Sequence, residues 1–158
     1  MWVDLKSCPD LITAASALNN RFAQETSFLS EAAFADLVAG ARVALAAPDA
    51  GAFLIAFDQD GDYDSPNFLW FRERFARFLY IDRVVVAAAA QGQGWGSRLY
   101  AELIQTAKTL GHERIVAEIN IQPPNPGSLA FHERLGFSSV GERALSSDKV
   151  VRYVALEV

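Results

Sequence analysis

The chain has 158 residues, of which 51% are hydrophobic and 21% charged, and its net charge is -5 from 14 basic and 19 acidic residues. This length suits one domain with its own core, and no apolar run approaches the roughly 20 residues of a membrane-spanning helix. A negative net charge disfavours nucleic-acid binding, whose affinity comes mainly from Lys and Arg on phosphates. We therefore expect a single globular domain over residues 1–158, with neither a membrane nor a nucleic acid as partner.

The first ten residues, MWVDLKSCPD, lack the basic and then apolar segments of a secretory signal, so we expect a cytoplasmic protein. Cys8 is the lone cysteine, which rules out an internal disulfide. His112 and His132 stand 20 residues apart without cysteines or clustered carboxylates, and we expect no metal site.

Apolar periodicity predicts two helices in the first part of the chain, over residues 9–26 and 30–40, the second capped by Ser30. Strands over 42–47 and 51–58 follow as a hairpin around the turn PDAG.

The segment DQDGDYD, residues 58–64, alternates aspartates like a calcium loop. Its glycine falls at the fourth position and Leu69 stands where a bidentate Glu is required, so we interpret it as a solvated turn. In residues 68–78, FLWFRERFARF, aromatics and arginines could suggest stacked nucleic-acid bases. The phenylalanines recur at three- and four-residue spacing, however, which favours a buried helix stripe with the arginines outside.

The second half of the chain gives clearer signals. We expect a strand over 78–86, a helix that follows a glycine turn and ends at Gly111, and a strand over 113–121. A short helix over 126–135 and two closing strands around SSDK complete the chain. This order of elements predicts a mixed α/β domain with one central sheet.

The glycine turn is QGQGWG, residues 91–96, between a strand and a helix. Such a turn directs free amides and the positive end of the helix dipole at one place, which suits an anion, most often phosphate. A mononucleotide loop is disfavoured because Ser97 and Arg98 stand where Lys and Ser or Thr are required. A dinucleotide fingerprint is disfavoured because no glycine stands at its sixth position.

The remaining pattern is Gln or Arg, two residues, Gly, one residue, and Gly or Ala, which Gln91, Gly94 and Gly96 satisfy. With the downstream segment NPGSLAFHERLGF, residues 125–137, this pattern resembles the GNAT superfamily of N-acetyltransferases. The resemblance covers about residues 78–140. It implies a mostly antiparallel central sheet with helices on both faces, and acetyl-CoA as cosubstrate.

The resemblance also implies roles for individual residues. Backbone groups of the strand before the glycine turn would hold pantetheine, the turn would hold the pyrophosphate, and the start of the next motif would contact the cofactor again. The residues concerned are Val84, Val85, Val86, Gln91, Gly92, Gln93, Gly94, Trp95, Gly96, Ser97, Asn125 and Ser128. His132 stands where the superfamily commonly has a Tyr near the thioester sulfur, and an imidazole there is the candidate general acid.

An attacking amine must lose a proton, and two acidic residues on the strands beside the expected cleft are candidate bases, Glu118 and Asp82. Asp82 is equally well explained as a charge partner of Arg83. Asn120 shares a strand face with Glu118, and the other candidates for acceptor binding precede the first motif. These candidates are Asn120, Tyr63, Asn67 and Trp70.

The function expected is acetyl transfer from acetyl-CoA to an amine of a small molecule or a peptide by direct attack, without a metal. The alternative is a non-catalytic acyl-CoA sensor or partner module of the same fold, in which His132 replaces a Tyr because no acid is needed. Dimerisation is common in the superfamily, so a homodimer is a further expectation, although no motif specifies one.

Overall fold

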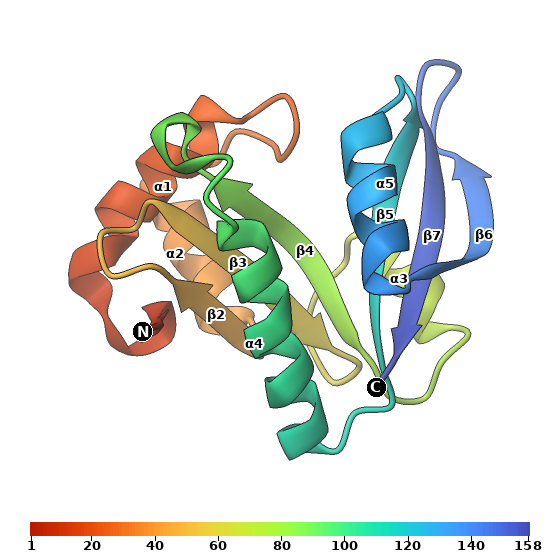
Figure 1. Cartoon of the computed structure of the whole chain (residues 1–158), viewed down its shortest axis with the longest axis horizontal. Coiled ribbons are helices and arrows are strands. Elements are labelled where there is room, and N and C mark those ends of the chain that lie inside the picture. Colours follow the sequence, from red (N-terminus) through yellow and green to blue (C-terminus); the bar gives the residue numbers. More distant parts are fainter.

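The computed structural model describes residues 1–158 as one α/β domain built on a single sheet (Figure 1). The strands are β1 (Val3–Asp4), β2 (Val43–Ala46), β3 (Ala52–Asp58), β4 (Leu79–Val86), β5 (Arg114–Gln122), β6 (Ser138–Ala144) and β7 (Val150–Glu157). The helices are α1 (Ile12–Arg21), α2 (Glu31–Gly40), α3 (Pro66–Arg72), α4 (Trp95–Leu110) and α5 (Pro126–Leu135), with short 3-10 turns at Leu5–Ser7, Pro9–Leu11 and Ala88–Ala90. No helix is both long enough and apolar enough to cross a bilayer.

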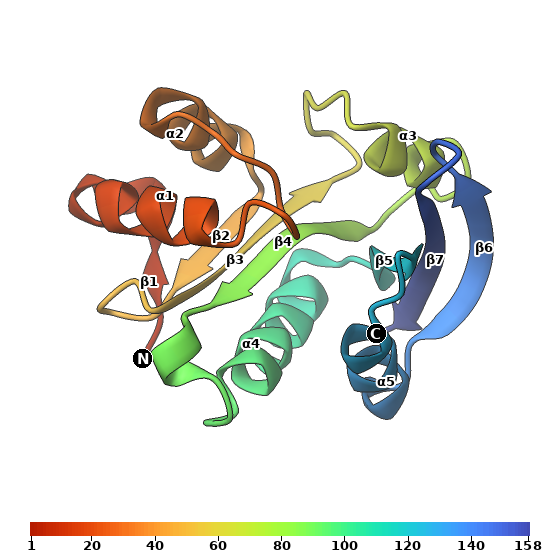
Figure 2. The same ribbon diagram turned by 90° about the horizontal axis from the view of Figure 1, so that it is seen from above.

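The sheet has the strand order β1-β2-β3-β4-β5-β7-β6, and every neighbouring pair is antiparallel except β4 and β5. Helices α1, α2 and α3 cover one face, while α4 and α5 cover the other (Figure 2). Each face has its own apolar core, one rich in phenylalanine and one built mainly on the buried side of α4. The expected mostly antiparallel sheet with helices on both faces is confirmed.

Strands β4 and β5 are paired only at their first residues, Leu79 with Ile115 and Tyr80 with Val116. Beyond that point they separate, although β4 stays paired with β3 and β5 with β7 (Figure 1). The register between β3 and β4 also shifts, since Ile55 faces Arg83 whereas the next residue faces Ile81, which leaves Asp82 as an extra residue in β4. The result is an opening in the middle of the sheet, lined by two strands.

Local signals explain where three of the helices start or end. The Ser30 side chain accepts a hydrogen bond from the Ala33 amide and caps α2 as expected. Helix α4 ends at Gly111, whose φ of 77° is the left-handed conformation expected there. At the start of α5 the Asn125 side chain accepts from the Ser128 amide at 3.2 Å.

Two predicted helices differ from the structure. The first was expected to run to residue 26 but ends at Arg21, because the side-chain amides of Asn19 and Asn20 donate to the backbone carbonyls of Ser27 and Leu29 and hold the chain in a loop. The helix expected over 68–78 is shorter.

Helix α3 ends at Arg72, and the amides of the two residues after Glu73 both donate to the Phe71 carbonyl in a tight turn. Phe78 is fully buried, but it enters the core from the residue before β4 and not from a helix. The spacing was therefore correct about which side chains are buried and wrong about the path of the chain.

Candidate active site

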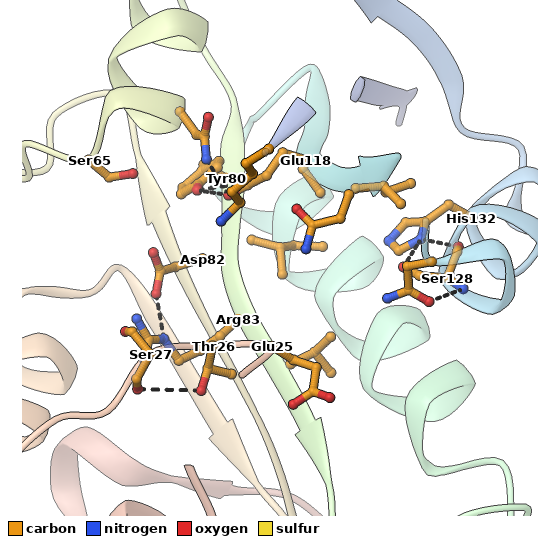
Figure 3. A pocket seen from close by; sticks show the side chains of 18 of the residues that line it. Glu25, Thr26, Ser27, Ser65, Tyr80, Asp82, Arg83, Glu118, Ser128 and His132 are labelled. Atoms are coloured by element: carbon orange, nitrogen blue, oxygen red, sulfur yellow. Dashed lines mark hydrogen bonds and ion pairs between the residues drawn. The ribbon is translucent and has the colours of Figure 1, made fainter. Parts of the chain in front are cut away.

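A cavity of about 360 Å³ fills the opening between β4 and β5, and we call it the cleft. Its walls come from β4, β5, the start of α5, the loop before α3 and the loop between α1 and α2 (Figure 3). Tyr80 and Asp82 line it from β4, Glu118 and Asn120 from β5, and His132 from α5. The separation of two strands thus brings together polar residues that are far apart in sequence.

Glu118 is the carboxylate in the cleft with the most hydrogen bonds. The Tyr80 hydroxyl donates to Oε1 at 2.6 Å and lies 3.0 Å from Oε2, and the Asn67 side chain donates to Oε1 at 3.0 Å. Asn67 is held in turn by the Tyr153 hydroxyl at 2.8 Å. Oε1 therefore carries two donors, while Oε2 shares one and is the freer oxygen.

The pKa of Glu118 is raised from 4.5 to about 7. Burial is the largest cause, because it disfavours the charged form, and the nearby charge of Asp82 adds to the rise. The hydrogen bonds from Tyr80 and Asn67 lower the pKa and oppose this effect only in part. Glu118 can therefore gain or lose a proton near neutral pH.

Asp82 is in a different state. Its Oδ2 accepts from Arg83 Nε at 2.6 Å, and its Oδ1 accepts from the Tyr63 hydroxyl at 2.5 Å. The Asp82 and Arg83 side chains are 6% and 8% exposed, and Arg83 also donates to Asn19 on α1 at 2.9 Å. Asp82 thus belongs to a buried ion pair that fastens the loop before α3 and the end of α1 to β4.

His132 is 5% exposed and both of its ring nitrogens have partners. Nδ1 lies 2.7 Å from the Ser128 carbonyl oxygen, and Nε2 lies 2.7 Å from the Tyr100 hydroxyl. Burial lowers the pKa of His132, and the bond to Ser128 acts in the opposite direction. The His132 ring is therefore enclosed in the wall of the cleft, with both nitrogens hydrogen-bonded.

The glycine turn lies at the other end of β4 and leads into α4. Gly92 and Gly94 have φ of 80° and 78°, and a Cβ at either would meet nothing within 4 Å, so open space lies beside them. The first helical hydrogen bond runs from the Arg98 amide to the Gly94 carbonyl, so the amides before it are not used by the helix. Free amides at a helix start, facing open space, fit a diphosphate.

The sequence matches the family model "Acetyltransferase (GNAT) family" over residues 50–137. This match spans more than half of the chain. The chain belongs to that family. It is an acetyl-CoA-dependent N-acetyltransferase, with acetyl-CoA as its cosubstrate.

Solved structures share the fold of this acetyltransferase. The ribosomal-protein-S18-alanine N-acetyltransferase from Escherichia coli is 19% identical with a TM-score of 0.72, and the comparison covers 99% of this chain and 92% of that one. An aminoglycoside 6'-N-acetyltransferase complexed with coenzyme A is 16% identical with a TM-score of 0.73, covering 99% and 96%. A ribosomal-protein-alanine N-acetyltransferase from Brucella melitensis is 17% identical with a TM-score of 0.73, covering 100% and 99%. No curated protein matches the sequence.

The structure places most of the predicted acceptor residues of this acetyltransferase together. Tyr63, Asn67 and Asn120 all line the cleft with Glu118. Trp70 does not line it. Its ring stacks on Tyr153 at 4.0 Å, so packing accounts for this residue.

The predicted cofactor residues are divided between the cleft and the glycine turn. Val84 lines the cleft, while Val85 is buried in the core on the face of α1 and α2. Gln91 ties the glycine turn to β4, since its side chain donates to the Val86 carbonyl at 3.2 Å. Asn125 and Ser128 line the cleft at the start of α5. No group of three or more His, Cys, Asp or Glu side chains could hold a metal ion.

Three features of the site were not expected from the sequence: the contacts of two tyrosine hydroxyls and one wall of the cleft. Tyr80 and Tyr100 were predicted only as strand and helix residues, yet their hydroxyls contact Glu118 and His132. The loop segment 25–27 lines the cleft opposite β5. Burial periodicity marks where a tyrosine ring lies but carries no information on where its hydroxyl ends, so no local signal could have identified these contacts.

Proposed function

We propose that this acetyltransferase transfers the acetyl group to a primary amine of a small molecule or a peptide by direct attack, with Glu118 as the proton acceptor. The observation that carries this proposal is the Glu118 carboxyl, which stands in the cleft with a pKa of about 7 and one oxygen largely free.

The need for a base follows from the acceptor. An alkylamine with a pKa near 10 is only about a thousandth neutral at pH 7, which costs about 4 kcal/mol. A carboxylate with a pKa close to the working pH is well matched to accept that proton, because it is ionised in a large fraction of molecules and still basic. Glu118 Oε2 is the atom proposed to take it.

Asp82 is less suited to this role. Both of its oxygens are occupied, and its charge is paired with Arg83 in a buried site. Proton uptake there would leave the guanidinium of Arg83 without its partner, which is costly. We assign Asp82 to positioning, since it holds Tyr63 and Arg83 in the wall of the cleft.

The chain's own backbone would hold the cosubstrate. The amides of residues 92–97 and the start of α4 would bind the pyrophosphate, and the backbone of residues 84–86, unpaired on its β5 side, would bind the pantetheine arm. Acetyl-CoA supplies a thioester carbon open to attack. Held in this way, it needs no covalent enzyme intermediate, and the lone Cys8 lies outside the cleft.

The alternative of a non-catalytic sensor is less well supported. A sensor has no use for a buried carboxyl that titrates near neutral pH, which costs folding stability when ionised. The hydrogen bonds from Tyr80 and Asn67 orient that carboxyl toward the cleft and favour a chemical role.

The test measures thiol release from acetyl-CoA with a panel of acceptors and confirms acetylated products by mass spectrometry. Because the similar structures include enzymes named for aminoglycosides and for a ribosomal protein's alanine, the panel holds an aminoglycoside, a peptide beginning with alanine, alkylamines and amino-acid amides. We expect turnover with at least one class, and loss of coenzyme A affinity by calorimetry in Gly94→Ala, whose backbone is strained by any side chain. Binding of coenzyme A without acetylation of any acceptor would favour the sensor.

A further inference from the structure

Tyr100 and His132 form a buried pair in the wall of the cleft. Tyr100 is 1% exposed and lies on α4, and His132 is 5% exposed and lies on α5. Both line the cleft together with Glu118. Their rings meet edge to face with centroids 5.3 Å apart, and Phe131 and Phe137 pack against both, so the pair is enclosed by aromatic rings.

The partners of His132 determine its tautomer. A carbonyl oxygen can only accept, so the Nδ1 that lies 2.7 Å from the Ser128 carbonyl must carry a hydrogen. No carboxylate contacts either ring nitrogen, and the ring is enclosed, which disfavours a second proton. In the neutral ring Nε2 then has a lone pair, and the Tyr100 hydroxyl at 2.7 Å is the donor in that bond.

The tautomer decides which of the two side chains can donate a hydrogen bond to a group in the cleft. The only hydrogen of the neutral His132 is committed to Ser128, inside its own helix, so His132 has none to offer to a group in the cleft. The hydrogen of the Tyr100 hydroxyl is held by Nε2 alone and can turn toward the cleft. The pair therefore has one available donor, and it belongs to Tyr100.

Tyr100 is also fixed relative to the glycine turn. It lies on the same helix, five residues after Trp95 at the start of α4, or about 8 Å along the helix axis. A cosubstrate whose diphosphate is bound at the start of α4 would thus meet a hydroxyl whose position is set by the same rigid element.

We propose that Tyr100 is a catalytic hydrogen-bond donor to the leaving sulfur, and that His132 is its positioning residue. This inference rests on the acetyl transfer proposed above. The new C–N bond forms, the C–S bond breaks, and its electron pair goes to sulfur. The Tyr100 O–H turns from His132 Nε2 to that sulfur without giving up its proton. The proton of the amine goes to Glu118, and the thiolate is protonated by solvent after release.

Keeping the proton on Tyr100 is consistent with its surroundings. Burial raises the pKa of Tyr100, and the charge of Glu118 raises it further. A phenol in such a site is a durable hydrogen-bond donor and a poor source of protons. Stabilising a developing negative charge with a fixed donor lowers the barrier without any proton transfer.

The kinetic test compares three variants and a fourth, His132→Gln, that should restore an acceptor. Tyr100→Phe removes the hydroxyl and keeps the ring, His132→Asn keeps a donor for Ser128 and removes Nε2, and Phe137→Leu alters packing against both rings but leaves their hydrogen bond. We expect kcat to fall about a hundredfold in Tyr100→Phe, with the KM for acetyl-CoA and coenzyme A binding by calorimetry within about threefold of the parent. The kcat of His132→Asn should fall by much of the same factor. His132→Gln should recover part of that kcat, because its side chain restores an acceptor for the Tyr100 hydroxyl. Phe137→Leu should keep the parental kcat.

If His132 only positions Tyr100, the double variant Tyr100→Phe/His132→Asn should lose no more of kcat than Tyr100→Phe alone. Both substitutions then remove the same contribution, which is the correctly oriented Tyr100 hydroxyl. The second readout is the tautomer, measured on the folded parent by nitrogen NMR of the imidazole, which does not depend on any variant folding. We expect a protonated Nδ1 and an unprotonated Nε2, whose resonance shifts in Tyr100→Phe.

A protonated Nε2 in the parent, or a Tyr100→Phe enzyme with the parental kcat, would overturn the assignment while leaving acetyl transfer intact. A parent that acetylates no acceptor would overturn acetyl transfer and this inference together. A double variant slower by the product of the two single effects would show that His132 acts on its own.

Discussion

Replacing Glu118 with Gln tests the proposed base with little change in shape. The amide oxygen can still accept from Tyr80 and Asn67, but the side chain can no longer take a proton from an amine. Removing a general base typically lowers the rate by about 10²- to 10⁴-fold, and we expect kcat/KM to fall within that range.

The raised pKa gives the same variant a second, independent signature. The rise from 4.5 to about 7, at about 1.4 kcal/mol per pKa unit, makes the ionised Glu118 cost the folded state at most about 3.5 kcal/mol. Because the folded pKa is the higher one, this cost is absent below pH 4.5, where Glu118 is protonated in both states, and it grows as the pH rises until it is complete above about pH 7. Between pH 5 and 8 the free energy of unfolding of the parent should therefore fall relative to that of Glu118→Gln.

The assay is a pH profile of kcat/KM with one alkylamine acceptor, together with urea unfolding of both proteins at each pH. For the parent, the slope of log(kcat/KM) against pH should be one unit steeper below about pH 7 than above it, because Glu118 must be ionised in the free enzyme. In Glu118→Gln this change of slope should disappear.

The matched control is Glu25→Gln, which removes an exposed carboxyl from the rim of the same cleft. It should keep both the change of slope and the rate. Glu118 is not the base if Glu118→Gln retains the change of slope near pH 7, or if its kcat/KM stays within about threefold of the parent when the expected loss is at least a hundredfold.

Two further predictions concern the structure around the cleft. Asp82→Asn should lower the free energy of unfolding by about 3 to 5 kcal/mol, because Arg83 is left buried without its charged partner, and urea unfolding measures this; a loss below about 1 kcal/mol would show that the pair is not structurally required. Gly141→Ala should destabilise the fold by about 1 to 3 kcal/mol, because its Cβ would lie 2.7 Å from the Trp70 ring, which would have to leave its stack on Tyr153; an unchanged melting temperature would contradict this.

Much of the fold could be predicted because its signals are local. Ser30 caps α2, Gly111 ends α4, and short runs of consecutive apolar residues mark β3 and β4, so each element is specified by a few neighbouring residues. The path of the backbone after Arg72 could not be predicted, because Phe78 is buried equally well from a helix or from the start of a strand. Burial determines the pattern of apolar residues and does not fix the backbone that presents them.

The candidate site divides in the same way. Glu118, Asp82 and His132 were found because a motif or a strand position marked them, and all three line the cleft. What each can do depends on partners from distant segments. Asn67 is 51 residues from Glu118, and Tyr100 is 32 residues from His132. Such contacts exist only after the chain has folded, and no periodicity reports them.

The two residue pairs that join β4 to β5 are the only ladder between two parts of the sheet, one of β1 to β4 and one of β5 to β7. An extended molecule lying along residues 81–86 could occupy the hydrogen-bonding positions that β5 leaves vacant. It would then contact both parts of the sheet and hold them together. Binding of such a molecule would stabilise the arrangement of the two parts, and any change that makes this arrangement less stable would weaken the binding by the same free energy. Weakening the joint at Leu79 and Tyr80 would therefore alter ligand affinity without touching a ligand-binding residue.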